Sequence, residues 1–223
     1  MCGRFSLFED VEQLMQQFGF EFAGEWDARF NVAPSQQVLA VAPGRDGRRK
    51  GAMLRWGLVP FWAEDEKIGY KMINARAETI EQKASFKGPL KKRRCLILAD
   101  GFYEWKRIGK DKQPFRFMMK DEQPFAFAGL WETWKKGGVA IHSCTIITTE
   151  ANALVEDVHD RMPVILGKDH QQIWLDPTVE EPAVLKPLLV PYKSELMKAY
   201  EVSSLVNSPK NDIRDVALPL NSK

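Results

Sequence analysis

Cys2 is the residue of this sequence whose type and position most clearly suggest chemistry. Methionine ahead of a small residue is typically removed during maturation, and its removal would make this cysteine the first residue. An N-terminal cysteine carries a thiol and an α-amine on adjacent carbons, with ordinary pKa values of about 8.5 and about 7.7–8.0. The amine condenses with an aldehyde to an imine, and the thiolate then closes a five-membered thiazolidine ring. Cys2 therefore suggests aldehyde capture, and the alternative is an early residue with no role.

The stretch 72–79 alternates apolar and polar residues, which predicts a strand. On such a strand Asn74, Arg76 and Glu78 share one face. The amide could hydrogen-bond a sugar or a phosphate, and the guanidinium could pair with a phosphate through two bonds. The alternative is a solvent-facing strand edge with an Arg–Glu pair.

Glu104 and His159, farther along the chain, are suited to proton transfer. Glu104 stands between Tyr103 and Trp105, just after an apolar run that predicts a buried strand. Apolar surroundings disfavour a charged carboxylate and raise its pKa, so this glutamate could move protons near neutral pH. The alternative is an exposed glutamate at a strand end. His159, one of three histidines, lies among acidic residues before a proline turn, a setting that suits an acid–base residue.

Arg4 and the aromatic run at 55–62 are candidate contacts for a ligand with phosphates and bases. Arg4 could hold a phosphate beside Cys2, or it could form a surface ion pair. The aromatic residues around glycine and proline could form a platform on which nucleobases stack. We expect Trp56, Phe61 or both to fill the core, and Trp62 to be exposed.

The remaining cysteines and histidines predict structural roles. Cys95 and Cys144 lie inside apolar runs and are expected to be small buried residues. His142 alternates with strand residues, and His170 stands at the polar start of a helix. No set of His, Cys, Asp or Glu has metal-ligand spacing, and the nucleotide-binding glycine motifs are absent. We therefore expect no metal site and no cofactor.

Composition and charge exclude several classes of protein. The 223 residues are 44% hydrophobic and 28% charged, which excludes a disordered chain, a fibrous repeat and a disulfide-rich miniprotein. The net charge is only +2, but residues 45–120 hold 20 basic against 9 acidic residues. Such a segment favours a polyanion partner, and the alternative is a solvated basic surface. No apolar run is long enough to span a membrane and no signal-peptide pattern is present, so we expect a cytoplasmic protein.

These candidate residues must be positioned by short strands and a few helices. Apolar spacing predicts a helix from Phe8 to Phe18 that ends at Gly19. Further helices are predicted at 150–158, 169–174 and 182–189, and strands at 38–42, 53–58, 95–99, 115–119, 125–131 and 142–148. Central strands with helices toward the ends predict an α+β fold. We expect one domain, residues 1–223, with a mainly antiparallel, barrel-like β-sheet and flanking helices.

Six motifs in order along the chain resemble those of the SRAP family, proteins named for an SOS-response-associated peptidase activity and now regarded as shields of abasic sites in DNA. The motifs are Cys2-Gly3-Arg4-Phe5, Phe30-Asn31-Val32-Ala33-Pro34, Trp56-Gly57-Leu58-Val59-Pro60, Asn74-Ala75-Arg76-Ala77-Glu78-Thr79, Ala99-Asp100-Gly101-Phe102-Tyr103-Glu104-Trp105 and Val158-His159-Asp160-Arg161-Met162-Pro163. They cover residues 2 to about 166, and residues 167–223 add little to the resemblance. Met162 stands where many relatives have arginine, which puts one phosphate contact in doubt.

The resemblance implies a single-stranded DNA partner containing an abasic site, to which the protein links through a thiazolidine on Cys2. It implies that Asn74 orients the opened deoxyribose, that Glu104 transfers protons, and that His159 assists at the sugar oxygen. It also implies an SRAP-like fold with a basic groove and a set of DNA-binding residues, namely Arg4, Trp62, Arg76 and Arg161.

Two other functions fit the same residues. One is a cysteine-type peptidase with an N-terminal nucleophile, of which removal of Met1 by the protein itself is a milder version. The other is a non-catalytic module for single-stranded DNA in which Cys2 is incidental. The hypothesis of a DNA partner predicts salt-dependent binding without sequence specificity. We further expect a monomer, because one lesion needs one domain, and association with the nucleoid if the protein is bacterial.

Overall fold

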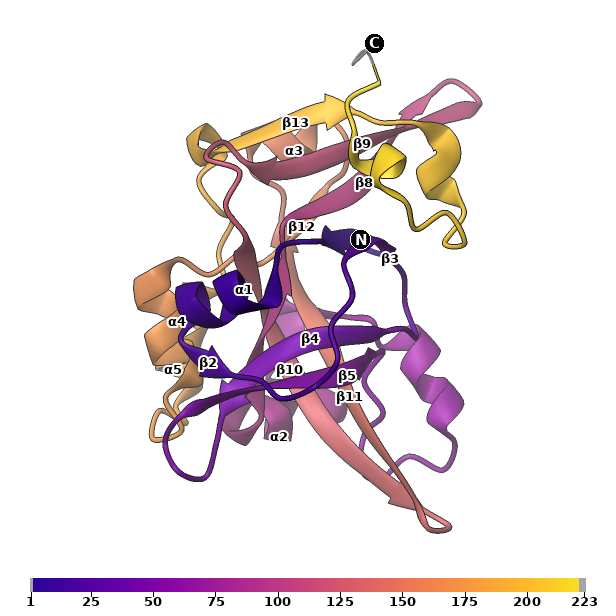
Figure 1. Ribbon diagram of the computed structural model, residues 1–223. Helices are drawn as coiled ribbons and strands as arrows, with labels where there is room; N and C mark the ends of the chain where they lie inside the picture. Colours follow the sequence, from indigo (N-terminus) through magenta and orange to yellow (C-terminus); the bar gives the residue numbers. More distant parts are fainter. Residues whose placement is uncertain (1, 221–223) are drawn as a thin grey trace.

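The computed structural model describes residues 2–220, and two β-sheets form its centre (Figure 1). The smaller sheet contains strands from both ends of the chain, because β1 lies in its interior and β13 at its edge. Its five strands, in spatial order, are β13 (Met197–Glu201), β9 (Asp111–Met119), β8 (Gly101–Ile108), β1 (Phe5–Leu7) and β3 (Arg29–Val32).

The larger sheet curls into a closed barrel. A parallel pairing of β5 with β11, Ser143 with Arg55 and Cys144 with Trp56, joins the two ends of a five-stranded run. The strands of this sheet, in order, are β12 (Arg161–Pro163), β11 (Val139–Glu150), β10 (Phe125–Lys136), β7 (Arg94–Ala99), β4 (Gln37–Pro43), β5 (Arg49–Trp56) and β2 (Phe20–Glu21), with β6 (Asn74–Arg76) paired to β11. The α+β fold with a mainly antiparallel, barrel-like sheet is confirmed.

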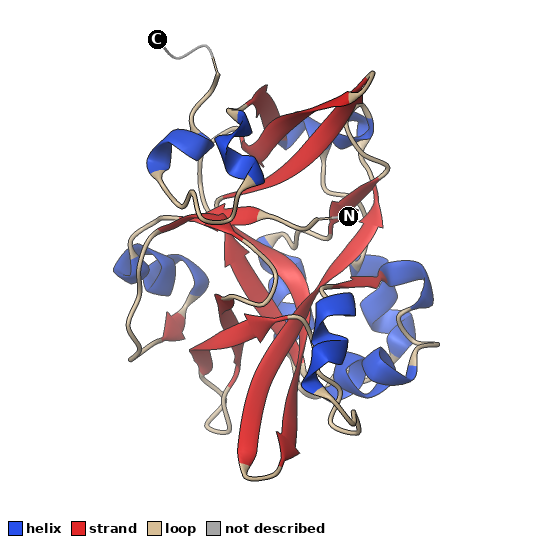
Figure 2. Ribbon diagram, turned by 90° about the vertical axis from the view of Figure 1, so that its right-hand side faces the viewer, coloured by secondary structure: helices blue, strands red, loops and turns tan. Residues whose placement is uncertain are grey.

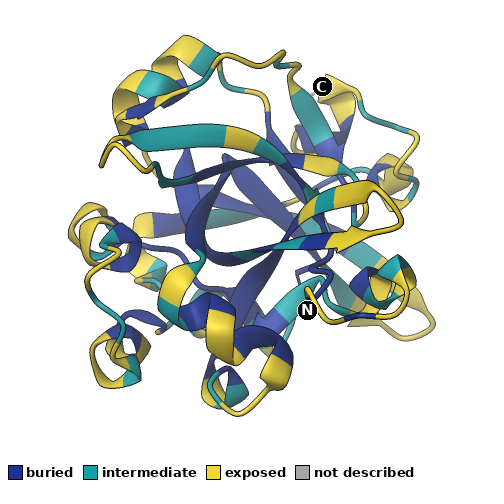
Figure 3. Ribbon diagram, turned by 90° about the horizontal axis from the view of Figure 1, so that it is seen from below, coloured by how far each residue is buried: buried dark blue, intermediate teal, exposed yellow. Residues whose placement is uncertain are grey.

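Alternation along the barrel strands divides the core in two. On β4, Leu39 and Val41 face one apolar cluster, while Val38 and Ala40 face the other. The first cluster is covered by helices, and the second also contains Phe5 and Phe102 from the smaller sheet. Figure 3 shows the buried strands at the centre, surrounded by helices that are exposed on their outer sides. Burial of both strand faces explains why the barrel strands are rich in apolar residues.

Helices flank the strands (Figure 2). Helix α1 begins after Asp10, whose carboxylate accepts hydrogen bonds from the Glu12 and Gln13 amides, and ends at Gly19 with φ +62°. No helix among residues 2–220 is long and apolar enough to cross a membrane. The helices are α1 (Val11–Phe18), α2 (Ala84–Lys92), α3 (Ala153–Glu156), α4 (Lys168–Leu175) and α5 (Pro182–Leu185), with 3-10 helices η1 (Glu66–Lys71), η2 (Ala77–Thr79), η3 (Lys186–Leu188), η4 (Ser194–Leu196), η5 (Ser204–Asn207) and η6 (Arg214–Ala217).

Several predicted elements differ from the structure. The helix predicted at 150–158 shortens to α3, because β11 continues to Glu150 before Asn152 caps the helix. Helix α2 was not predicted, since Gly88 and Pro89 lie inside it. The strand predicted at 72–79 covers only Asn74–Arg76, so Glu78 lies in η2 and does not share a strand face with the other two polar residues.

Candidate active site

The pairing of β1 with β8 places Cys2 beside Glu104. Phe5 lies opposite Phe102, and the Tyr103 amide donates to the Arg4 carbonyl at 3.0 Å. Continuing this antiparallel register brings residues 2 and 3 alongside the part of β8 that carries Glu104. The Cys2 side chain is fully buried, and its Sγ donates to the Arg4 carbonyl at 3.9 Å. Burial raises the pKa of this thiol, and the nearby Glu104 carboxylate raises it further.

Glu104 lies within β8 and is 3% exposed, so the expectation of a carboxyl group in apolar surroundings is confirmed. Burial raises the pKa of Glu104 to about 7, and the Asp160 carboxylate contributes to the rise. A carboxyl group with this pKa is present in both protonation states near neutral pH. It can therefore accept a proton in one step of a reaction and return it in another.

His159 lies between α3 and β12, and its Nδ1 atom accepts a hydrogen bond from the Arg161 amide at 3.0 Å. Nδ1 is also 3.0 Å from Oδ1 of Asp160, whose side chain is largely exposed. Burial lowers the pKa of His159. The lowered pKa and the Arg161 amide, which can only donate, favour the neutral ring with its proton on Nε2; in this state Nδ1 forms no hydrogen bond with the Asp160 carboxylate, and Nε2–H is a donor.

Asn74 carries a buried amide without a partner. Its Oδ1 and Nδ2 atoms are inaccessible to solvent and form no hydrogen bond with any residue in the described part of the chain. The buried Oγ1 atom of Thr148 is also unpaired. In the parallel pairing of β11 with β6, Thr148 lies opposite Arg76, two residues beyond the pair formed by Ile146 and Asn74. Unpaired buried polar groups are costly, so these atoms gain most from a polar ligand.

Thr148 was not among the residues selected from the sequence. It lies in the apolar run of β11, where a threonine is an ordinary strand residue. It shares full burial and an unpaired hydroxyl with Thr145 of the same strand, and both properties depend on the packing of other elements.

The apolar cluster that contains Cys2 reaches the segments that carry Asn74 and His159. Cys2 belongs to it, and Ile73 and Val158, the neighbours of Asn74 and His159, pack against it. Glu104 raises the pKa of the Cys2 thiol, which places its carboxylate close to that group. The fold thus brings Cys2 at the N-terminus, Glu104 of β8 and the segment around Asp160 before β12 close together.

The predicted phosphate-binding arginines differ in their surroundings. Arg4 is partly buried, and its Nη1 donates to Oδ1 of Asn31 at 2.9 Å and to the Val206 carbonyl at 2.6 Å. Its guanidinium lies over the Trp105 ring at 5.8 Å. Arg4 therefore connects the segment after Cys2 to the C-terminal part of the chain.

Arg161 forms a two-bond ion pair with Glu78, at 2.6 and 3.0 Å. An Arg–Glu pair was the alternative considered for the Asn74 strand, but the arginine in it is Arg161 and not Arg76. Arg76 is exposed and forms no ion pair within residues 2–220, although its charge helps to lower the pKa of Glu78. Of the predicted arginines, Arg76 has the guanidinium most accessible to a phosphate.

The aromatic run presents two rings to solvent. Trp56 is fully buried and its Nε1 donates to the Ile73 carbonyl, while Trp62 is 47% exposed and Phe61 64% exposed. The core role considered for Phe61 is therefore wrong, and the exposure predicted for Trp62 is confirmed. The loop is fixed from beneath, because Trp134 Nε1 donates to the Ala63 carbonyl at 2.7 Å.

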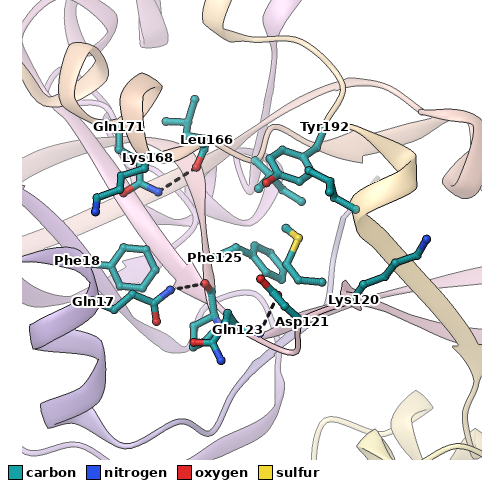
Figure 4. A pocket seen from close by; sticks show the side chains of 15 residues that line it. Gln17, Phe18, Lys120, Asp121, Gln123, Phe125, Leu166, Lys168, Gln171 and Tyr192 are labelled. Atoms are coloured by element: carbon teal, nitrogen blue, oxygen red, sulfur yellow. Dashed lines mark hydrogen bonds between the residues drawn. The ribbon is translucent and has the colours of Figure 1, made fainter.

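A cavity of about 410 Å³ lies away from these residues (Figure 4). Gln17 and Phe18 of α1 lie on one side of it and Tyr192 on the other. None of the predicted site residues lines it. The candidate site is thus a packed cluster of polar groups and not this cavity.

The family model described as SOS response associated peptidase (SRAP) matches residues 1–209. The chain belongs to the SRAP family. It is 52% identical to the abasic site processing protein YoaM of Bacillus subtilis, over 95% of each chain. It is 36% identical to the abasic site processing protein HMCES of Gallus gallus, over 75% of this chain and 56% of that protein.

Solved structures show the same SRAP fold. A Bacteroides thetaiotaomicron protein superimposes with a TM-score of 0.89, at 28% identity and over 98% of this chain and 99% of that one. A Bordetella bronchiseptica protein gives a TM-score of 0.79 at 27% identity, over 91% of this chain and all of that one. The resemblance inferred from six motifs thus extends to the whole fold.

Proposed function

We propose that this SRAP protein processes abasic sites by binding single-stranded DNA and linking Cys2, after removal of Met1, to the ring-opened sugar. The observation that carries the proposal is a fully buried Cys2 beside a carboxyl group whose pKa is about 7. The names of the relatives in Bacillus subtilis and Gallus gallus, both abasic site processing proteins, support it. DNA would supply the reacting group, because the ring-opened abasic site is an aldehyde.

The covalent step requires one proton donor and acceptor near the reacting carbon. The α-amine of Cys2 attacks C1′ of the aldehyde, and the resulting carbinolamine loses water with a proton supplied by Glu104. The thiol sulfur then adds to the imine carbon, and the thiol proton passes through Glu104 to the nitrogen. The product is a thiazolidine, and the net reaction releases one water. A pKa of about 7 suits Glu104 to both transfers.

Ring opening of the sugar comes before this step. Glu104 would take the proton of the anomeric hydroxyl and return it to the ring oxygen as the C1′–O4′ bond breaks, while His159 would donate a hydrogen bond to that oxygen from Nε2. The unpaired amide of Asn74 would hydrogen-bond the released hydroxyl and hold the open chain. His159 can donate from Nε2, and the Asn74 amide is not already engaged in a hydrogen bond with the described residues.

Flanking nucleotides would contact the exposed residues around the site. Arg76 is accessible to a phosphate, and the exposed rings of Phe61 and Trp62 can stack against bases. Arg161 would reach a phosphate by exchanging the half-exposed Glu78 carboxylate for it. Arg4 would act through the Nη2 side of its guanidinium, since Nη1 is occupied.

A cysteine peptidase fits the local geometry less well. Such a peptidase needs a thiolate at Cys2, formed by a histidine partner or by the α-amine of the same residue. Here burial raises the pKa of the Cys2 thiol and lowers that of His159, which disfavours the thiolate–imidazolium pair. The thiol also donates to the Arg4 carbonyl.

A denaturing gel tests the proposed function. The purified protein, with Met1 removed, is mixed with single-stranded oligonucleotides that contain or lack an abasic site. We expect a covalent band with abasic DNA alone. Peptide hydrolysis without this band would support the peptidase, and equal non-covalent binding to both oligonucleotides without a band would support a simple DNA-binding module.

A further inference from the structure

We infer that the outer part of the β8–β9 hairpin, residues 105–114, is an arm that binds the phosphates of the DNA strand on one side of the lesion. This inference rests on the proposed function and adds a second contact region to it. The hairpin continues directly from Glu104 and projects from the body of the molecule, at the upper right of Figure 1.

The arm holds accessible positive charge with little negative charge beside it. Many basic residues of the segment 45–120 are already paired, as Arg48 and Lys50 are with Glu21, and Arg116 is with Asp100. The arm, in contrast, contains one acidic residue, Asp111, and four basic residues that have no acidic partner within the described residues 2–220, namely Lys106, Arg107, Lys110 and Lys112. These charges are available to a polyanion.

The register of the hairpin places like charges together. Arg107 lies directly opposite Lys112 on the neighbouring strand. Like charges in this position destabilise a sheet, because their side chains are close neighbours. A phosphate between them would remove the repulsion, which favours an anionic partner at this place.

The same strand carries the reacting group and the arm. Side chains alternate along β8, so Lys106 and Ile108 project from the same face as Glu104, whereas Arg107 and the opposite Lys112 project from the other face. The rise from Glu104 to the turn at Lys110 is about 20 Å, or about six nucleotides at the spacing of a stacked strand. DNA anchored at Glu104 would therefore pass along the arm on one side of the lesion only.

The turn gives the arm a defined shape. Gly109 has φ +62° and is the first residue of a two-residue turn between Ile108 and Asp111. Such a turn matches the natural twist of the two strands, so the basic side chains are held in a fixed arrangement. The edge strand β13 pairs with β9 as far as Phe115, and Val202 still bonds Pro114 and Gln113, so the arm is open along that edge only beyond Gln113.

Charge removal at matched positions tests this inference. The variant R107Q/K110Q/K112Q neutralises the arm, and K83Q/K87Q/K91Q removes the same charge from exposed or half-exposed lysines in and next to α2. Affinity is measured against salt for single strands that carry a stable abasic analogue. One strand has about a dozen nucleotides on each side of the lesion, and two others are cut to about two on either the 5′ or the 3′ side.

We expect the arm variant to bind the long strand more weakly, with a salt slope smaller by about 2, since each lost phosphate contact removes about 0.7. On one of the two shortened strands, the wild type and the arm variant should bind alike. The α2 variant should keep the wild-type slope. The charge-retaining variant R107K/K110R/K112R should bind as the wild type does, which excludes a folding defect as the cause.

An unchanged slope in the arm variant would overturn the inference, and so would equal losses in the arm and α2 variants. If the wild type and the arm variant bound alike on both shortened strands, or differed on both, binding on one side of the lesion would also be contradicted. The proposed function is judged separately, by the covalent band that the wild type forms with authentic abasic DNA. Absence of that band would reject the function whatever the salt slopes are.

Discussion

At the scale of single residues, burial makes Glu104 the group best suited to move protons. The Glu104→Gln change keeps the size of the side chain and one hydrogen bond but cannot take up a proton. We expect adduct formation to slow by roughly 10²–10⁴-fold with nearly unchanged DNA affinity. Single-turnover kinetics on abasic DNA measure the rate, and an unchanged rate would assign the proton transfer to another group, with His159 first.

The same substitution should stabilise the folded protein at alkaline pH. The pKa of Glu104 is raised to about 7, so the native state holds this proton more tightly than the unfolded chain does. The free energy of unfolding therefore falls by about 3 kcal/mol as pH rises from about 4.5 through about 7. Urea unfolding at pH 5 and pH 8 should show this loss in the wild type and a smaller one in E104Q.

Cys2 is tested by removing the two halves of its reaction separately. Cys2→Ala keeps an N-terminal amine, so it should abolish the stable adduct and leave an imine that borohydride traps. An uncleavable tag ahead of Cys2 keeps the thiol and should abolish both products. DNA binding should survive in each case, because phosphate contacts supply most of the affinity. A stable adduct from the tagged protein would rule out the thiazolidine mechanism.

Asn74 should contribute to the reaction and not to stability. Its amide is buried without a hydrogen-bond partner in the described part of the chain, which costs about 1–3 kcal/mol. We expect Asn74→Ala to leave the free energy of unfolding unchanged or to raise it, while adduct formation slows. A marked destabilisation in thermal melts would show that the amide is a structural group.

At the scale of elements, a buried ion pair fixes the position of β1. Asp100 accepts hydrogen bonds from Ser6, from the Phe8 amide and from Arg116, which is 2% exposed. Gly101 is required beside them, because a Cβ atom there would lie 2.6 Å from Nε of Arg116. These bonds hold β1 against β8 and β9, and so set Cys2 relative to Glu104.

Removing one partner of this pair should be costly. Asp100→Ala leaves the buried Arg116 charge uncompensated, and we expect a loss of about 3–5 kcal/mol of stability. Denaturant unfolding measures it, with the exposed Asp121→Ala as the control. A loss below about 1 kcal/mol would show that the pair does not hold β1 in place.

At the scale of the whole molecule, the distribution of charge predicts salt-dependent DNA binding. Affinity for single-stranded DNA should fall steeply between low and high salt. Arg76→Glu should weaken binding more than Lys87→Glu, which changes the same charge on α2. Flat salt dependence, or equal effects of the two substitutions, would show that the DNA face is misplaced.

The sequence by itself determined the residue types that carry the proposed chemistry and the class of fold. Cys2, Asn74, Glu104 and His159 stand in motifs that follow one another in a fixed order, and the spacing of apolar residues predicts central strands with helices around them. Alternation and turn residues are local properties, so they can be recognised without knowing which strands pair. The end of helix α1 at Gly19 is likewise a local property that the sequence shows.

Only the tertiary structure decided which partners these residues have. The pairing of Glu78 with Arg161 joins residues 83 positions apart, and the closure of the barrel by β5 and β11 joins segments that are slightly more distant. The pKa of Glu104 and the unpaired Asn74 amide depend on burial by several elements at once. Burial and pairing are properties of the packed chain, because they are created by contacts between segments that the sequence leaves far apart.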